Sequence, residues 1–139
     1  MIVLDTNVTS ELMRASPSRA VVAWLRSQDP NELYSTAATV AEVRYGIARL
    51  PSSANRRRLS EAAVEVFSAF PDRVLAFDLS AAGEYGDLVA ARERAGTPIN
   101  GFDAQVAAIC RSHRAALATR NVKDFENTGI RVANPWAET

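Results

Sequence analysis

Histidine, cysteine and lysine are almost missing from this chain, which has one of each among its 139 residues. A single cysteine, Cys110, excludes an internal disulfide bond and any zinc site built from paired thiolates. The only histidine, His113, lies near the end of a helical pattern, where a positive charge is favoured at the helix C-terminus. We therefore interpret Cys110 as a buried core residue and His113 as a solvated one, which leaves a nucleophilic triad without a base.

Long apolar runs and an excess of either charge are also absent. No segment approaches the ~20 apolar residues that a membrane-spanning helix needs, and the opening MIVLD has no basic region of the kind that begins a signal peptide. The 16 Lys and Arg residues balance 16 Asp and Glu, which argues against nucleic-acid binding by overall charge alone. With 47% hydrophobic and 23% charged residues, the chain is typical of a soluble globular protein. We expect one domain, residues 1–139, in the cytoplasm.

Short apolar runs alternate with longer helical patterns along the sequence. The runs predict strands at residues 2–4, 33–35, 74–77, 116–119 and 130–133. Apolar residues at helical spacing predict helices at residues 18–28, 39–50, 54–70, 80–95 and 102–113. This alternation implies parallel strands joined by right-handed crossovers, and therefore an α/β fold in three layers, with helices on both faces of the sheet.

Four acids fall at predicted junctions where a helix begins. Asp5 ends the first strand, and the other three each lie three residues after a residue that can cap a helix: Glu42 after Thr39, Asp103 after Asn100 and Asp124 after Asn121. Taken singly, each has a simple structural explanation, because an acid at the third helical position bonds back to the cap and interacts favourably with the helix dipole. Asp5 has a similar explanation as the cap of the turn that follows it.

Their joint placement favours a second interpretation. In a parallel sheet the helices that follow strands all begin at one edge, so these acids converge in one cleft if their strands are neighbours. For Asp103 this position is an assumption, because its predicted helix follows another helix. Clustered carboxylates repel one another until a proton or a cation relieves the repulsion. With only oxygen ligands available, the cation would be Mg²⁺ or Mn²⁺, and the chemistry would be metal-assisted phosphodiester hydrolysis.

At these residues the sequence resembles the PIN-domain ribonucleases, and within them the VapC and FitB-like toxins of bacterial toxin–antitoxin pairs. The similar segments run from end to end: MIVLDTNVTSEL at the start, TVAEVRYGIARLP at 39–51, DAQVAAIC at 103–110 and LATRNVKDFENTGIRVANPW at 117–136. The resemblance implies an α/β/α domain with a five-stranded parallel sheet and a Mg²⁺- or Mn²⁺-dependent endonuclease that cleaves RNA. It also implies a homodimer and a small cognate antitoxin whose tail covers the acidic cleft.

The same resemblance assigns roles to the acids. Asp5 and Asp103 would be the main metal ligands, and Glu42 would be a third acid of the pocket. The fourth position is open between Asp124, which is the stronger ligand, and Asn121, and we favour Asp124 slightly.

Three further residues receive weaker assignments from the resemblance. Thr6 and Asn7 would support Asp5, and Arg120 would meet substrate phosphate. Each has a simple structural alternative. Thr6 and Asn7 could serve only in turn or cap hydrogen bonds, and Arg120 could be an ordinary surface cation. Phe102 departs from the small residues usual before the third acid of the family, which places a ring beside Asp103 and bears on the width of the pocket.

Two other classes of protein compete with a nuclease. One is a noncatalytic interaction module of the same fold. The other is an aspartyl-phosphate receiver or a dehalogenase-like protein, in which an aspartate after a strand accepts a phosphoryl group. Against the latter, Asn7 stands where a dehalogenase needs a second acid, and no adjacent acid pair accompanies Lys123 as a receiver requires.

Overall fold

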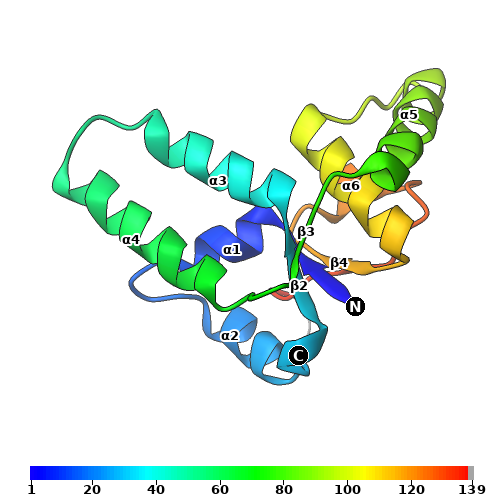
Figure 1. Ribbon diagram of the computed structural model, residues 1–139. Helices are drawn as coiled ribbons and strands as arrows, with labels where there is room; N and C mark the ends of the chain where they lie inside the picture. The colour runs from blue at the N-terminus through cyan, green and yellow to red at the C-terminus, as the bar shows by residue number, and fades with distance from the viewer. Residues whose placement is uncertain (138–139) are drawn as a thin grey trace.

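A parallel sheet forms the centre of the computed structural model, which describes residues 1–137 (Figure 1). Its five strands lie in the order β3-β2-β1-β4-β5 and have these bounds: β1 Ile2–Leu4, β2 Leu33–Thr36, β3 Val74–Leu75, β4 Ala116–Ala118 and β5 Val132–Ala133. In the central pairings, Ile2 lies opposite Leu33 on one side and Ala116 on the other. The predicted α/β fold with a five-stranded parallel sheet is confirmed.

The sheet is covered by helices on both faces because neighbouring residues of a strand point to opposite sides. Val3 of β1 belongs to a core with α5 (Leu79–Arg94) and α6 (Gly101–His113), whereas Leu4 belongs to a core with α1 (Thr6–Leu12) and α2 (Arg19–Arg26). Both side chains are almost completely buried, as expected for a central parallel strand.

The remaining helices extend the molecule to one side. Helices α3 (Ala37–Ala48) and α4 (Ala54–Ser68) lie side by side as a helical hairpin that projects from the sheet (Figure 1). Two short 3-10 helices, η1 (Pro30–Glu32) and η2 (Val122–Phe125), complete the elements of residues 1–137. Within that part of the chain, every helix is too short or too polar to cross a membrane.

Two predictions about helix starts were wrong. The segment after Asp5 was expected to be a turn, but burial of Val8 and capping by Asp5 stabilise seven helical residues there, as helix α1. Helix α3 begins after Thr36, which accepts a hydrogen bond from the Thr39 amide at 3.0 Å, so Thr39 is not the cap. Glu42 therefore lies within α3, beyond its first turn.

Strand β3 is shorter than the predicted run at 74–77. It lies at the edge of the sheet and pairs only with β2, through Ser35 with Val74 and Thr36 with Leu75. Because β2 gives way to α3 at Ala37, no strand partner remains for the last two residues of the run. These residues form the loop that leads into α5.

Candidate active site

The cleft of interest lies where the strand order reverses. From β1 the chain adds β2 and β3 on one side of the sheet and then returns to add β4 and β5 on the other. In open parallel sheets, ligands bind beyond the carboxyl ends of the two strands that flank this reversal. Asp5 directly follows β1 and Thr119 directly follows β4, and the Asp5 amide donates to the Ala118 carbonyl at 3.0 Å.

Asp5 is held rigidly at the floor of this cleft, where it is only 2% exposed. Its Oδ1 accepts from the Thr6 amide at 2.8 Å, as the cap of α1, and its Oδ2 accepts from the Thr119 hydroxyl at 2.8 Å. The Asn7 amide group lies 3.4 Å from the same Oδ2. Burial raises the pKa of Asp5 despite these hydrogen bonds, and the negative charges of Glu42 and Asp124 raise it further. Asp5 is thus both a helix cap and a cleft carboxylate.

Asp103 enters the cleft from the first turn of α6. The predicted capping by Asn100 is confirmed: its Oδ1 accepts from the Asp103 amide at 2.9 Å, and its Nδ2 donates to Asp103 Oδ2 at 2.7 Å. Burial and the charge of Asp5 are the main causes that raise the pKa of Asp103 from 3.8 to about 6. The two carboxylates are therefore close enough to repel each other, although more than half of the chain separates them in sequence.

Glu42 is half-buried and reaches the cleft from α3. Its Oε1 accepts a hydrogen bond from the Thr6 hydroxyl. Since the Thr6 amide also donates to Asp5, one residue of α1 connects the two acids. The electrostatic effect of Glu42 on both Asp5 and Asp103 shows that the three carboxylates share one region.

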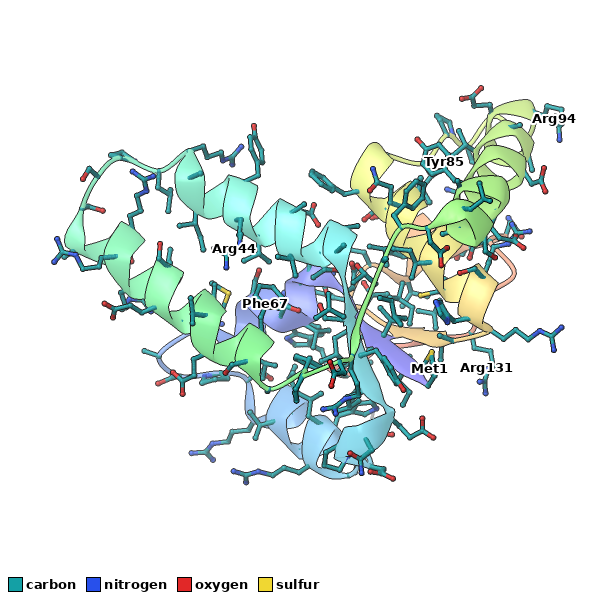
Figure 2. All side chains as sticks on the ribbon, viewed as in Figure 1. Met1, Arg44, Phe67, Tyr85, Arg94 and Arg131 are labelled. Carbon is teal, nitrogen blue, oxygen red and sulfur yellow. The ribbon has the colours of Figure 1, made fainter. Side chains whose placement is uncertain are left out.

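The cleft has a volume of about 510 Å³ and combines carboxylates, hydroxyls, amides, two arginines and an indole ring. Its walls are formed by Asp5, Thr6, Asn7, Ser10, Glu11, Arg14, Glu42, Asp103, Arg120, Asn121 and Trp136. A second cavity of about 570 Å³ lies at the opposite edge of the sheet and includes Arg131, which Figure 2 shows on the same side of the molecule as Met1. Because that cavity has only one carboxylate in its walls, Glu84, the acidic cleft is the candidate active site.

The two candidates for the fourth position lie differently with respect to the cleft. Asn121 lines the cleft, whereas Asp124 is exposed within η2 and does not. Asn121 occupies the predicted N-cap position of η2, but its side chain makes no capping hydrogen bond there. Arg92 donates to the Asp124 carbonyl at 3.1 Å, which ties this turn to α5. The charge of Asp124 still raises the pKa values of Asp5 and Asp103, so it acts on the cleft from outside its wall.

Sequence reasoning missed several residues that line the cleft, and also Thr119, which is buried beneath its wall and donates to Asp5. Thr119 carried a signal, since it ends the apolar run next to the first strand just as Asp5 ends its own. Glu11, in the last turn of α1, is buried and pairs at 3.1 Å with Arg14, which follows just beyond the end of that helix. Trp136 had no local signal, because it reaches the cleft only through the tertiary fold.

The donor set of the cleft fits a small divalent cation. Among residues 1–137, no three Asp, Glu, His or Cys side chains are grouped so that they alone would hold a metal ion. Mg²⁺ does not require such a group, because it commonly takes one or two carboxylates and completes its shell with water and substrate phosphate oxygens. The mutual repulsion of Asp5 and Asp103 is the feature that a cation would relieve.

The chain belongs to the PIN-domain family, since residues 2–130 match the model of that family. It is 44% identical over 138 residues to VapC ribonuclease Y4jK from Sinorhizobium fredii, with 98% of each chain covered. It is 36% identical to toxin FitB from Neisseria gonorrhoeae, covering 98% of this chain and 99% of FitB.

The fold is also similar to a solved structure. The crystal structure of FitAcB from Neisseria gonorrhoeae superposes with a TM-score of 0.88 and 35% identity, covering 99% of this chain and 100% of that one. Membership of the PIN family argues against the receiver and dehalogenase-like alternatives.

Proposed function

We propose that this protein is a Mg²⁺- or Mn²⁺-dependent endoribonuclease and the toxin of a type II toxin–antitoxin pair. The observation that carries the proposal is the meeting of Asp5 and Asp103 in one cleft, where the charge of Asp5 helps to raise the pKa of Asp103 to about 6. The names of the relatives, a VapC ribonuclease and a FitB toxin, support both the reaction and the biological role.

In this proposal Asp5 and Asp103 hold the cation and Glu42 serves the attacking water. When bound, the cation would polarise a phosphoryl oxygen and lower the pKa of that water. Thr119 and the Thr6 amide stabilise the ionised form of Asp5, which is the form a cation needs. Glu42 is held at Oε1 by the Thr6 hydroxyl and would accept the proton of the water at Oε2. The fourth position falls to Asn121, with Asp124 acting through its charge.

The partners follow from the same family membership. An apolar cavity of about 470 Å³ between α1, α2 and α4 shares Arg14 with the acidic cleft, which supports an antitoxin segment that runs from one to the other. The exposed apolar side chains Val74, Phe77 and Leu79 at the β3 edge support a homodimer. We expect the toxin to act in the cytoplasm, where its RNA substrates are found.

The test is cleavage of mixed RNA by purified protein freed of antitoxin, with Mg²⁺ or with a chelator. We expect cleavage only with Mg²⁺, its loss in Asp5→Ala and Asp103→Ala, and its retention in Asp87→Ala, which changes an exposed acid of α5 as a matched control. Cleavage that persists in both cleft variants would overturn the assignment of these acids. A wild-type protein that cleaves no RNA would support the noncatalytic module.

A further inference from the structure

The acidic cleft contains two arginines, Arg14 and Arg120, which differ in the partners of their guanidinium groups. The Arg14 Nη1 lies 3.1 Å and 3.4 Å from the two carboxylate oxygens of Glu11, so its charge is neutralised by an acid three residues earlier in the chain. Arg120 is exposed and forms no ion pair with any carboxylate of residues 1–137. Its guanidinium carbon lies 3.9 Å from the centre of the Trp136 ring. Within the described cleft, Arg120 is thus the cation available to a ligand.

The backbone of Arg120 and the Trp136 residue are both fixed by further hydrogen bonds or packing contacts. The Arg120 amide donates to Asn7 Oδ1 at 3.1 Å, which fixes the backbone of Arg120 beside the Asp5 loop. Trp136 packs against the core that contains Leu4, and its amide donates to Asn134 Oδ1 at 3.0 Å. The long Arg120 side chain has no such support of its own, so the indole ring is what restricts it.

The contact also explains why Arg120 does not pair with the nearby acids. A guanidinium held by an aromatic ring is attracted to the ring through its face, which leaves the N–H groups at its edge free. These edge groups match the oxygens of a phosphate in a bidentate arrangement. A cation kept on the ring also does not neutralise the Asp5 and Asp103 pair, which remains available to a divalent ion.

We propose that Trp136 is a positioning residue that holds the Arg120 guanidinium at the rim of the cleft, where it binds a backbone phosphate of the RNA strand. This inference rests on the proposed function and deepens it by naming the group that docks the strand and the residue that orients it. It accounts for phosphate binding by a chain whose net charge is zero, because one oriented arginine acts locally.

The test is a double-mutant cycle on the kinetics of RNA cleavage. Loss of a charge-assisted contact in Arg120→Ala should raise KM about tenfold or more with kcat little changed. Trp136→Leu should raise KM about three- to tenfold, and Arg120→Ala/Trp136→Leu should match Arg120→Ala alone, since the ring acts only through the arginine. Trp136→Phe, which keeps a ring and is the milder change for folding, should raise KM less than about threefold.

A matched control separates positioning from packing. Leu25 packs against the same core as Trp136, so Leu25→Ala should lower the melting temperature without changing KM. An unchanged KM in Trp136→Leu, or KM increases that multiply in the double variant, would overturn the inference.

Binding measured without cleavage distinguishes this inference from the proposed function. The affinity of the Asp103→Asn protein for a single-stranded RNA should weaken on Arg120→Ala and Trp136→Leu with the same lack of additivity. This binding pattern together with a wild-type protein that cleaves no RNA would overturn the ribonuclease proposal and still support the role of Trp136. Affinity that is independent of both residues would overturn that role.

Discussion

Thr119 is the residue on which the hydrogen bonds of the candidate active site converge. Its fully buried hydroxyl donates to Asp5 Oδ2 at 2.8 Å and accepts from Asn7 Nδ2 at 3.0 Å and from the Asn121 amide at 3.1 Å. A hydroxyl can make one donation and two acceptances, so this one is saturated. It connects the ends of β1 and β4, and through them the main buried acid and the candidate fourth position.

Thr119→Val tests this role because it removes the hydroxyl and keeps the shape. Three polar groups lose a partner, two of them in the buried Asp5 and the half-buried Asn7, so we expect the free energy of unfolding to fall by about 1–3 kcal/mol. Without the hydrogen bond that lowers its pKa, Asp5 should also need more Mg²⁺ for half-maximal cleavage. The measurements are urea denaturation and a Mg²⁺ titration of activity.

Thr128→Val is the control for this change. Thr128 is equally buried and donates to the Phe125 carbonyl at 2.6 Å, away from the cleft. The Thr128→Val protein should be less stable than the wild type, with an unchanged Mg²⁺ requirement for cleavage. A Thr119→Val protein with the Mg²⁺ requirement of the wild type would contradict the role given to this hydroxyl.

The raised pKa of Asp103 predicts how stability changes with pH in the metal-free protein. Folding raises this pKa from 3.8 to about 6, so between these values the folded chain binds more protons than the unfolded chain. The free energy of unfolding should therefore fall as the pH rises from about 4 to about 6, by a modest amount because the side chain is only half-buried.

Urea denaturation in a chelator, at about pH 4 and about pH 7, measures this slope. Asp103→Asn should reduce the slope, because the amide does not titrate, and the raised pKa of Asp5 accounts for a slope of the same sign that remains. Saturating Mg²⁺ should oppose the loss of stability at neutral pH, because it binds the ionised form of Asp103. A slope that is unchanged in Asp103→Asn would show that other groups cause it.

At the scale of elements, each cleft carboxylate depends on how a helix begins. Asp5 caps α1 itself, Asp103 lies in the capped first turn of α6, and Glu42 depends on the start of α3 after Thr36. Thr36 is completely buried, and its hydroxyl donates to Thr39 Oγ1 and accepts from the Thr39 amide, both at 3.0 Å. The direction in which α3 leaves β2 therefore sets the position of Glu42.

Thr36→Ala should weaken both the helix and the site. The lost cap is expected to lower the free energy of unfolding by about 1–2 kcal/mol, and the looser first turn should lower kcat several-fold. Ser53→Ala removes the exposed cap of α4, a helix that carries no cleft carboxylate, and should lower stability alone. Cleavage kinetics give kcat for each variant, and urea denaturation gives its stability. Equal kcat values in the two variants would contradict the dependence of Glu42 on the start of α3.

At the scale of the whole molecule, the cleft joins segments that are far apart in sequence. Its walls come from α1, α3, α6 and the segments that follow α1, β4 and β5, so a cation bound there would bind the folded chain and not the unfolded one. Such binding stabilises the entire fold, because a domain of this size is expected to unfold cooperatively.

Mg²⁺ should consequently raise the melting temperature. At a concentration of about 100 times its Kd, the added stability is about 2.7 kcal/mol, which corresponds to a shift on the order of 5–10 °C for a chain of this length. Asp5→Ala should abolish the shift, and Asp87→Ala should retain it. A shift of the same size from NaCl at matched ionic strength would show that screening, not binding, is responsible.

The sequence by itself determined the features that depend on local pattern. Apolar runs and helical spacing placed all five strands and five of the six helices, because burial imposes a period on each element. Asn100 and Asp103 were recognised as a cap and its acid from their spacing alone. The buried Cys110, whose pKa burial raises, was recognised from the small apolar residues around it.

Only the tertiary structure decided which of these residues meet. That α6 begins at the carboxyl edge of the sheet depends on strand order, which no local pattern contains. The same holds for the choice of Asn121 over Asp124 in the cleft wall and for the contact of Arg120 with Trp136. Periodicity is a property of neighbours in the chain, whereas a cleft is made by residues that packing brings together from distant parts of it.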